Sequence, residues 1–149
     1  MTFTKSYQLI AKSYGMRYPD DEVEILDEEG KVVGAKKRGE IDRLRDILHT
    51  TSIFVITPDK RLALAKVPAR PDEPTALSTG KLGATAATII RKGQTRDEAA
   101  LRGLTKELNL PDVQPVFLGE TFERMPSNVR RLIASYYVVH AEPLTANPI

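Results

Sequence analysis

The sequence predicts a single α/β domain. Short aliphatic segments of strand length recur between residues 22 and 139, and turn-forming residues separate them. One segment, residues 95–109, carries both a start signal and a stop signal for an α-helix. The chain has 149 residues, about the size of one domain with one core. We therefore expect one domain built from several strands and at least one helix.

Composition excludes several classes of protein. The 22 basic and 20 acidic residues nearly balance, so nucleic acid is not an expected partner. The chain has no cysteine, which excludes disulfides, thiolate metal sites and cysteine nucleophiles and suits a reducing compartment. No apolar run approaches the ~20 residues that a membrane helix needs. We expect a soluble, cytoplasmic protein that does not enter a membrane.

Residues 1–21 are predicted to be an N-terminal extension with a short helix. Apolar residues recur there at spacings of three and four, which would place them on one helical face: Tyr7, Ile10, Ala11 and Tyr14. The first nineteen residues contain no acid, so a transit peptide is the alternative.

The next segments favour a hairpin and a linker. Residues 22–38 contain two apolar runs around Glu28, Glu29 and Gly30, and glycine takes the positive φ that a tight reversal needs. Residues 40–48 have apolar positions at helical spacing, which predicts a short amphipathic helix or turn before the next strand.

A second hairpin follows. Residues 52–56 and 62–67 are predicted strands joined by a turn at 57–60, where Pro58 presets φ. Residues 68–80 contain three prolines and are predicted to be a surface loop at the rim of a pocket. A strand rich in small residues is expected at 82–90.

The helix after it has the clearest boundaries. Thr95 and Glu98 form a capping box at its start, and a buried leucine stripe is expected at positions 101, 104 and 108. Asn109 is suited to the left-handed conformation and Pro111 prevents further winding, so the helix should end near Leu108.

The remaining chain predicts strands at 113–118 and 131–139 around a loop at 120–128. Residues 142–149 contain two prolines and are expected to form a frayed tail. The predicted domain therefore spans residues 22–141.

Residues 88–110, TIIRKGQTRDEAALRGLTKELNL, resemble a Nudix box, whose pattern is G-x5-E-x7-R-E-U-x-E-E-x-G-U with U aliphatic. The pattern aligns without a gap. Four positions match it: Arg102, Leu104, Glu107 and Leu110. Five depart from it, because the family has Gly, Glu, Glu, Glu and Gly where this chain has Thr88, Gln94, Gly103, Lys106 and Asn109. The resemblance is therefore to a degenerate box.

The upstream half resembles Nudix proteins of the isopentenyl-diphosphate-isomerase-like branch, through Asp27, Gly30, Gly34 and His49. With the box, this likeness covers most of residues 22–139. It implies a Nudix-type α/β/α sandwich with a mixed β-sheet. Isomerase chemistry itself is not expected, because that enzyme needs a cysteine and a histidine near the start of the box.

The resemblance also implies a chemistry. Nudix hydrolases cleave a nucleoside diphosphate linked to another group, and carboxylates of the box helix hold Mg²⁺ or Mn²⁺. The corresponding helix face here carries Gly103, Lys106 and Glu107, so one carboxylate remains. Replacing glutamate by lysine changes the local charge by two units, at about 4 kcal/mol per charge at 4 Å and an effective dielectric of 20. Metal affinity at Glu107 should be weak.

Two acids outside the box could compensate for the lost carboxylates. Glu120 and Glu123 fall where some Nudix enzymes recruit a further metal ligand or base, so with Glu107 they are the catalytic candidates if the protein is active. Lys106 could instead take over part of the cation's role. The simpler alternative makes Lys106 a solvated helix residue.

Arg102 and Gly103 are expected to be structural, the arginine through orientation or a helix ion pair and the glycine through close packing. Basic residues predicted to converge on an anionic ligand are Lys66, Arg91, Lys106 and Arg131, with scattered surface charge as the alternative. The aromatic residues Phe117, Phe122, Tyr136 and Tyr137 are expected to serve the core more than to stack on a base.

Three functions follow from these observations. The preferred one is a Nudix-fold domain that binds a nucleotide or another phosphorylated ligand, with weak or no metal-dependent hydrolysis and no required cofactor. The second is a divergent pyrophosphohydrolase that uses Mg²⁺ or Mn²⁺. The third is a structural or protein-interaction domain. A homodimer formed through the N-terminal extension is possible under the third.

Overall fold

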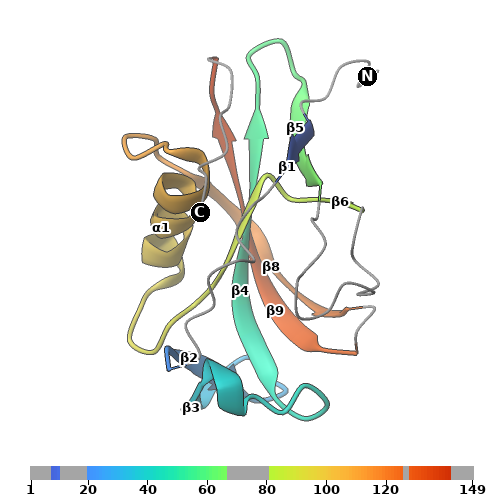
Figure 1. The fold of residues 1–149 in the computed structure, drawn as a ribbon, viewed down its shortest axis with the longest axis vertical. Helices are drawn as coiled ribbons and strands as arrows, with labels where there is room; N and C mark the ends of the chain where they lie inside the picture. Colours follow the sequence, from blue (N-terminus) through green and yellow to red (C-terminus); the bar gives the residue numbers. More distant parts are fainter. Residues whose placement is uncertain (1–7, 11–19, 67–80, 126–127, 142–149) are drawn as a thin grey trace.

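The computed structural model describes residues 8–10, 20–66, 81–125 and 128–141. They form one mixed β-sheet with an α-helix packed on it (Figure 1). The strands are β1 (Gln8–Ile10), β2 (Glu22–Leu26), β3 (Val32–Lys37), β4 (Ile47–Ile56), β5 (Leu62–Lys66), β6 (Leu82–Gly83), β7 (Ala86–Ile89), β8 (Val116–Arg124) and β9 (Arg130–Val139). The helices are the 3₁₀ turn η2 (Arg38–Glu40) and α1 (Arg96–Leu108). The predicted α/β class with a mixed sheet is confirmed.

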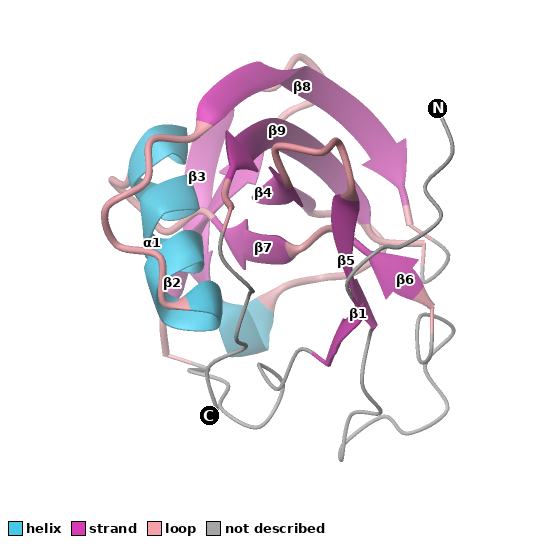
Figure 2. Ribbon diagram, turned by 90° about the horizontal axis from the view of Figure 1, so that it is seen from above, coloured by secondary structure: helices cyan, strands magenta, loops and turns pink. Residues whose placement is uncertain are grey.

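Strand β4 is the hub of the sheet. One of its edges pairs in parallel with β9 along its whole length, from Ile47 opposite Arg130 to Ile56 opposite Val139. Its other edge is shared by three antiparallel neighbours, β2, β7 and β5. In both views α1 lies on one side of these strands, while β1, β5 and β6 lie toward the other (Figures 1 and 2).

The helix begins and ends at the predicted residues. The Oγ1 atom of Thr95 accepts a hydrogen bond from the amide of Glu98 at 3.1 Å. Asn109 takes the left-handed conformation, with φ of 54°, and its N–H caps the last turn. The buried face differs from the predicted leucine stripe, because Leu101 is only half-buried. Small residues replace it against the sheet, and the buried set is Ala99, Ala100, Gly103, Leu104 and Leu108.

The main core lies between α1 and the sheet. Alternation along β4 directs Thr51, Ile53 and Val55 toward the helix. From β9, Ala134, Tyr136 and Val138 join the same core. A smaller cluster of Val23, Ile25, Leu48 and Val129 packs at the β2 end of the sheet. The core between α1 and the sheet and the cluster near β2 therefore occupy different parts of the sheet.

Two hairpins match the sequence prediction. Strands β2 and β3 pair around a turn in which Gly30 has φ of 83° and Asp27 Oδ1 accepts from the amides of Glu29 and Lys31. Those backbone hydrogen bonds, chiefly the one from Lys31, hold the pKa of Asp27 below its usual value. Strands β4 and β5 are joined by the predicted turn at 57–60.

Other elements differ from the prediction. Residues 8–10 form strand β1, parallel to β5, where a helix was expected, because pairing with a sheet edge overrides a weak helical pattern. The rest of that predicted helix, the loop at 68–80 and the tail lie outside the described residues. In the 40–48 segment the predicted turn forms instead of the alternative helix, but Ile47 and Leu48 already belong to β4. Their apolar spacing fits a buried strand as well as a helix.

Strand β8 is the largest correction. Residues 120–124 were predicted to lie in a loop, yet they pair with Arg130–Ala134 of β9 as part of a nine-residue strand. The register shifts between Phe117 and Gly119, where Gly119 has φ of 148°. This bulge lets the strand continue past the glycine.

Within the described residues, no helix has the length and apolar character that crossing a bilayer requires.

Candidate functional site

The middle of α1 packs against β7 too closely to carry a side chain at position 103. A Cβ atom added to Gly103 would lie 2.7 Å from Thr88 Cγ2 and 3.3 Å from Ile53 Cδ1. Thr88 is itself fixed, since its hydroxyl lies 2.5 Å from that of Thr51 and donates to the carbonyl of Ala99 at 3.1 Å. Thr88 stands where the Nudix pattern has glycine, and Gly103 stands where it has glutamate. The larger side chain of this pair is therefore on strand β7 and not on helix α1.

The remaining carboxylate of the box is engaged with the backbone. Glu107 Oε2 accepts a hydrogen bond from the amide of Ala87 at 3.0 Å, which ties the end of α1 to β7. Lys106, next to it, is exposed. A divalent cation needs several oxygen ligands, and this face offers one carboxylate beside an ammonium and a buried glycine. The residues therefore do not fit the metal that the Nudix box holds.

Glu120 and Glu123 do not supplement Glu107. They point to opposite faces of β8, since Glu120 pairs with Ala134, on the core face, and Glu123 pairs with Arg131. Glu120 bonds to Arg96 at the start of α1, at 2.5 Å. Arg96 and Glu107 are eleven positions apart, which is about 16 Å along a helix rising about 1.5 Å per residue. Nowhere in the described part of the chain do three His, Asp or Glu residues form a group able to hold a metal ion.

Glu120 belongs instead to a charged network beside the helix start. His49 Nε2 lies 2.7 Å from Glu120 Oε2, and His49 Nδ1 lies 3.2 Å from Glu24 Oε2. His49 therefore connects the two carboxylates, with one at each ring nitrogen. The His49 and Glu120 side chains are 14% and 24% exposed, so this network is largely screened from water. Sequence analysis had identified His49 and Glu120 but not their contact.

Aromatic residues extend this region toward the core. The Arg96 guanidinium stacks 3.8 Å from the ring centre of Phe117, which lies 5.4 Å from that of Tyr136. Tyr136 is buried, and its hydroxyl donates to Asp97. Burial, followed by that hydrogen bond and the charge of Asp97, raises the pKa of Tyr136 well above its ordinary value. Tyr136 serves the core, as expected, whereas Phe117 and Phe122 are 38% and 46% exposed and do not.

The predicted basic residues do not converge. Lys66 ends β5 and pairs with β1 and β6. Leu132 and Ala134 of β9 are buried in the core. Because side chains alternate along a strand, Arg131 projects from the other face of β9, which α1 does not cover. Arg91, in contrast, lies next to α1 and forms an ion pair with Asp21 at 2.9 Å. Arg102 reaches from the helix to the carbonyl of Ile89, to which its Nη2 donates at 2.6 Å.

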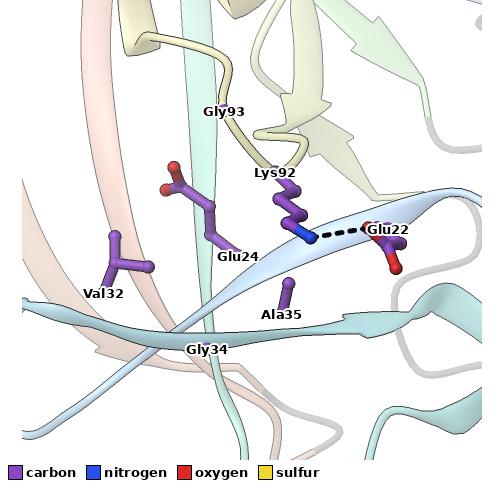
Figure 3. Close-up of a pocket in the computed structure, with 7 residues that line it drawn as sticks. All are labelled: Glu22, Glu24, Val32, Gly34, Ala35, Lys92 and Gly93. Atoms are coloured by element: carbon purple, nitrogen blue, oxygen red, sulfur yellow. Dashed lines mark ion pairs between the residues drawn. The ribbon is translucent and has the colours of Figure 1, made fainter.

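A cleft opens between the β2–β3 hairpin and the loop that leads into α1. Its volume is about 360 Å³, and it is lined by Glu22, Glu24, Val32, Gly34, Ala35, Lys92 and Gly93. Figure 3 shows Lys92 reaching down to Glu22, with which it pairs at 3.3 Å, while Ala35 and Val32 rise from β3. Glu24 joins the cleft to the His49 network. No local sequence signal identified this cleft, because it is built by strand pairing.

Comparison with known proteins identifies the fold. No protein-family model matches the sequence, and no curated protein matches it significantly. Among solved structures, DR0079 from Deinococcus radiodurans superposes with a TM-score of 0.69 at 17% identity, covering 86% of this chain and 77% of that one. A solution structure of DR0079, described as a hypothetical Nudix protein, gives a TM-score of 0.51 at 18% identity, over 90% and 74% of the two chains.

Two further solved structures agree. The MutT protein from Methanosarcina mazei gives a TM-score of 0.57 at 8% identity, over 68% of this chain and 70% of that one. The dihydroneopterin triphosphate pyrophosphohydrolase of E. coli gives 0.51 at 12% identity, over 67% and 74%. At these identities the likeness is one of fold. The chain has the Nudix fold, as the degenerate box implied.

Proposed function

We propose that this chain is a Nudix-fold binding domain for a nucleotide or another phosphorylated ligand, in which metal-dependent hydrolysis is weak or lost. The observation that carries the proposal is the contact between Thr88 and Gly103, because it fills the space of a box carboxylate with protein. Lys106 and the hydrogen bond from Ala87 to Glu107 support it. In this proposal α1, capped at both ends, remains as a scaffold for the ligand site.

In this proposal Lys106 supplies positive charge where a hydrolase holds its cation. A lysine ammonium binds phosphate as a point charge. Lys106→Glu should therefore raise affinity for Mn²⁺ and lower affinity for a nucleoside diphosphate, both measured by calorimetry. Unchanged values for both ligands would remove Lys106 from the site and leave it a solvated helix residue.

The test of the function separates binding from turnover. A panel of nucleoside diphosphate derivatives should raise the thermal unfolding midpoint without Mg²⁺ or Mn²⁺. Adding either metal should release no phosphate. Phosphate release that Glu107→Gln abolishes would overturn the proposal and establish the alternative.

That alternative is a divergent pyrophosphohydrolase. It is favoured by the retained Glu107 and by the fold likeness to a protein named as a pyrophosphohydrolase. It requires Glu120 or Glu123 to move toward Glu107 when substrate binds. Glu120→Gln should then abolish turnover, whereas a binding domain would keep its ligand affinity after this change.

A further inference from the structure

Three arginines gather where the β2–β3 hairpin meets α1. Arg91 precedes the helix, Arg102 projects from it, and Arg38 follows β3. Asp21 connects two of them, because its carboxylate pairs with Arg91 at 2.9 Å and its carbonyl accepts from the amide of Arg38 at 2.9 Å. Arg102 donates to the carbonyl of Ile89, two residues before Arg91. The charges of Arg91 and Arg38 both act on Arg102, and that of Arg91 acts on Arg38, so the three guanidinium groups lie within electrostatic range of one another.

Their charges are only partly balanced. Among the described residues, Asp21 forms an ion pair with Arg91, and the charges of Asp21 and Glu107 both act on Arg102. Residues 11–19, which precede Asp20 and Asp21 in the chain, contain no Asp or Glu. The Nε atoms of Arg91 and Arg102 are buried and have no hydrogen-bond partner. Buried donors without acceptors are costly, and three like charges repel one another.

The pKa directions agree with this arrangement. Burial is the main cause that lowers the pKa of Arg102, and the charge of Arg91 lowers it further. Burial likewise leads the lowering of the pKa of Arg38; Asp21 opposes it, and Arg91 adds to it. Both shifts show that the charged form of each arginine is disfavoured at this place. An anion bound among the three arginines would favour their charged forms and so offset that energetic cost.

We propose that Arg38, Arg91 and Arg102 form a binding site for a phosphate group at the junction of the hairpin and α1. Phosphate matches the site because guanidinium groups donate in pairs to its oxygens and three of them can surround it. The proposal rests on the proposed function for its ligand class. It takes Arg91 from the predicted basic residues and adds Arg38 and Arg102 as contacts for one phosphate group.

The experiment titrates the full chain with inorganic phosphate and, separately, with ADP at constant ionic strength set by chloride. Affinity is measured by calorimetry, and the Nε–Hε signals of the arginines are followed by NMR. Both probes should shift the Arg91 and Arg102 signals. Arg38→Gln should weaken binding about tenfold or more, because it removes charge-assisted hydrogen bonds.

Arg38 is chosen because no described side chain forms a hydrogen bond or ion pair with it, so the variant should fold. The matched control is Arg45→Gln, which removes the same charge from an arginine that is 88% exposed and pairs only at the surface with Asp42. It should change phosphate affinity less than about twofold, as screening of surface charges requires. Equal weakening by both variants, or phosphate that leaves the Arg91 and Arg102 signals unmoved, would overturn the site.

The two proposals fail in different ways. ADP that binds with undiminished affinity to Arg38→Gln would remove the arginine site and leave the proposed function intact. Inorganic phosphate that binds through the arginines, while no nucleotide in the panel binds, would support the site and refute nucleotide binding.

Discussion

The start of α1 and its middle make opposite kinds of contact with the sheet. At the start, Arg96 and Asp97 hold charged and polar partners, and Arg96 connects through Glu120 to His49 and Glu24. In the middle, Gly103 meets Thr88 with no room for any side chain. Carboxylates therefore contact basic side chains at the start of the helix. Of the positions that a Nudix hydrolase uses for metal, Gly103 is packed, Lys106 is basic and Glu107 accepts a hydrogen bond from the backbone. A helix can keep its place in a fold while its exposed chemistry changes.

The largest expected effect tests the packed middle. Gly103→Ala should destabilise the protein by up to about 2 kcal/mol, since overpacking costs up to about 3 kcal/mol and the helix propensity of alanine offsets roughly 1 kcal/mol of it. Thr88→Ser removes the methyl group 2.7 Å from the added Cβ and keeps the hydroxyl that binds Thr51 and Ala99. In the double variant most of the loss should disappear. Urea unfolding of the four proteins in this cycle measures the coupling, and additive effects would contradict the contact.

The second effect tests the charged start. Glu120→Gln should lower stability by about 1 kcal/mol, because the carboxylate binds both His49 and Arg96 in a mostly buried position. Glu123→Gln is the matched control on the same strand and the opposite face, and it should change stability less. Thermal unfolding at several salt concentrations measures both variants. If Glu123→Gln lowered stability as much as Glu120→Gln, the contacts of Glu120 with His49 and Arg96 would not account for the loss.

A comparable but more local effect concerns the cap. Thr95→Ala removes the hydroxyl that accepts from the Glu98 amide and should cost about 1 kcal/mol. Thr95→Ser keeps that hydroxyl and should remain near the original stability. Far-ultraviolet circular dichroism during urea unfolding provides the measurement, and equal losses in the two variants would assign the effect to the methyl group instead.

The smallest effect appears at high pH. The pKa of Tyr136 is raised on folding, so its contribution is complete below the ordinary tyrosine pKa near 10 and is lost as pH rises above it. Stability should therefore fall more steeply above pH 10 in the original protein than in Tyr136→Phe. Thermal midpoints between pH 8 and 11 compare the two. Parallel pH profiles would show that ionisation of Tyr136 is not linked to folding.

Local signals explain which parts of this molecule were predictable. The capping box, Asn109 and the turn at Gly30 act within a few residues, so sequence alone located α1 and the first hairpin. The length of β8 was missed because Gly119 and the polar residues after it resemble a loop until β9 pairs with them. The network from Glu24 to Glu120 depends on strand register across most of the chain. The Thr88–Gly103 contact was foreseen only as close packing, since its partner comes from another element.

Strand pairing also affects how this chain must fold. The full-length partner of β4 is β9, and Ile47 meets Arg130 only after 82 intervening residues have been made. Contacts so distant in sequence slow folding, and for mixed sheets of this kind we expect rates well below those of helical bundles. On the ribosome, β4 emerges before β9 and remains without its main partner until the residues of β9 have been made. Its exposed edge is then a site for mispairing, so chaperone dependence during synthesis, measured by the yield of soluble protein with and without chaperones, is the expected consequence.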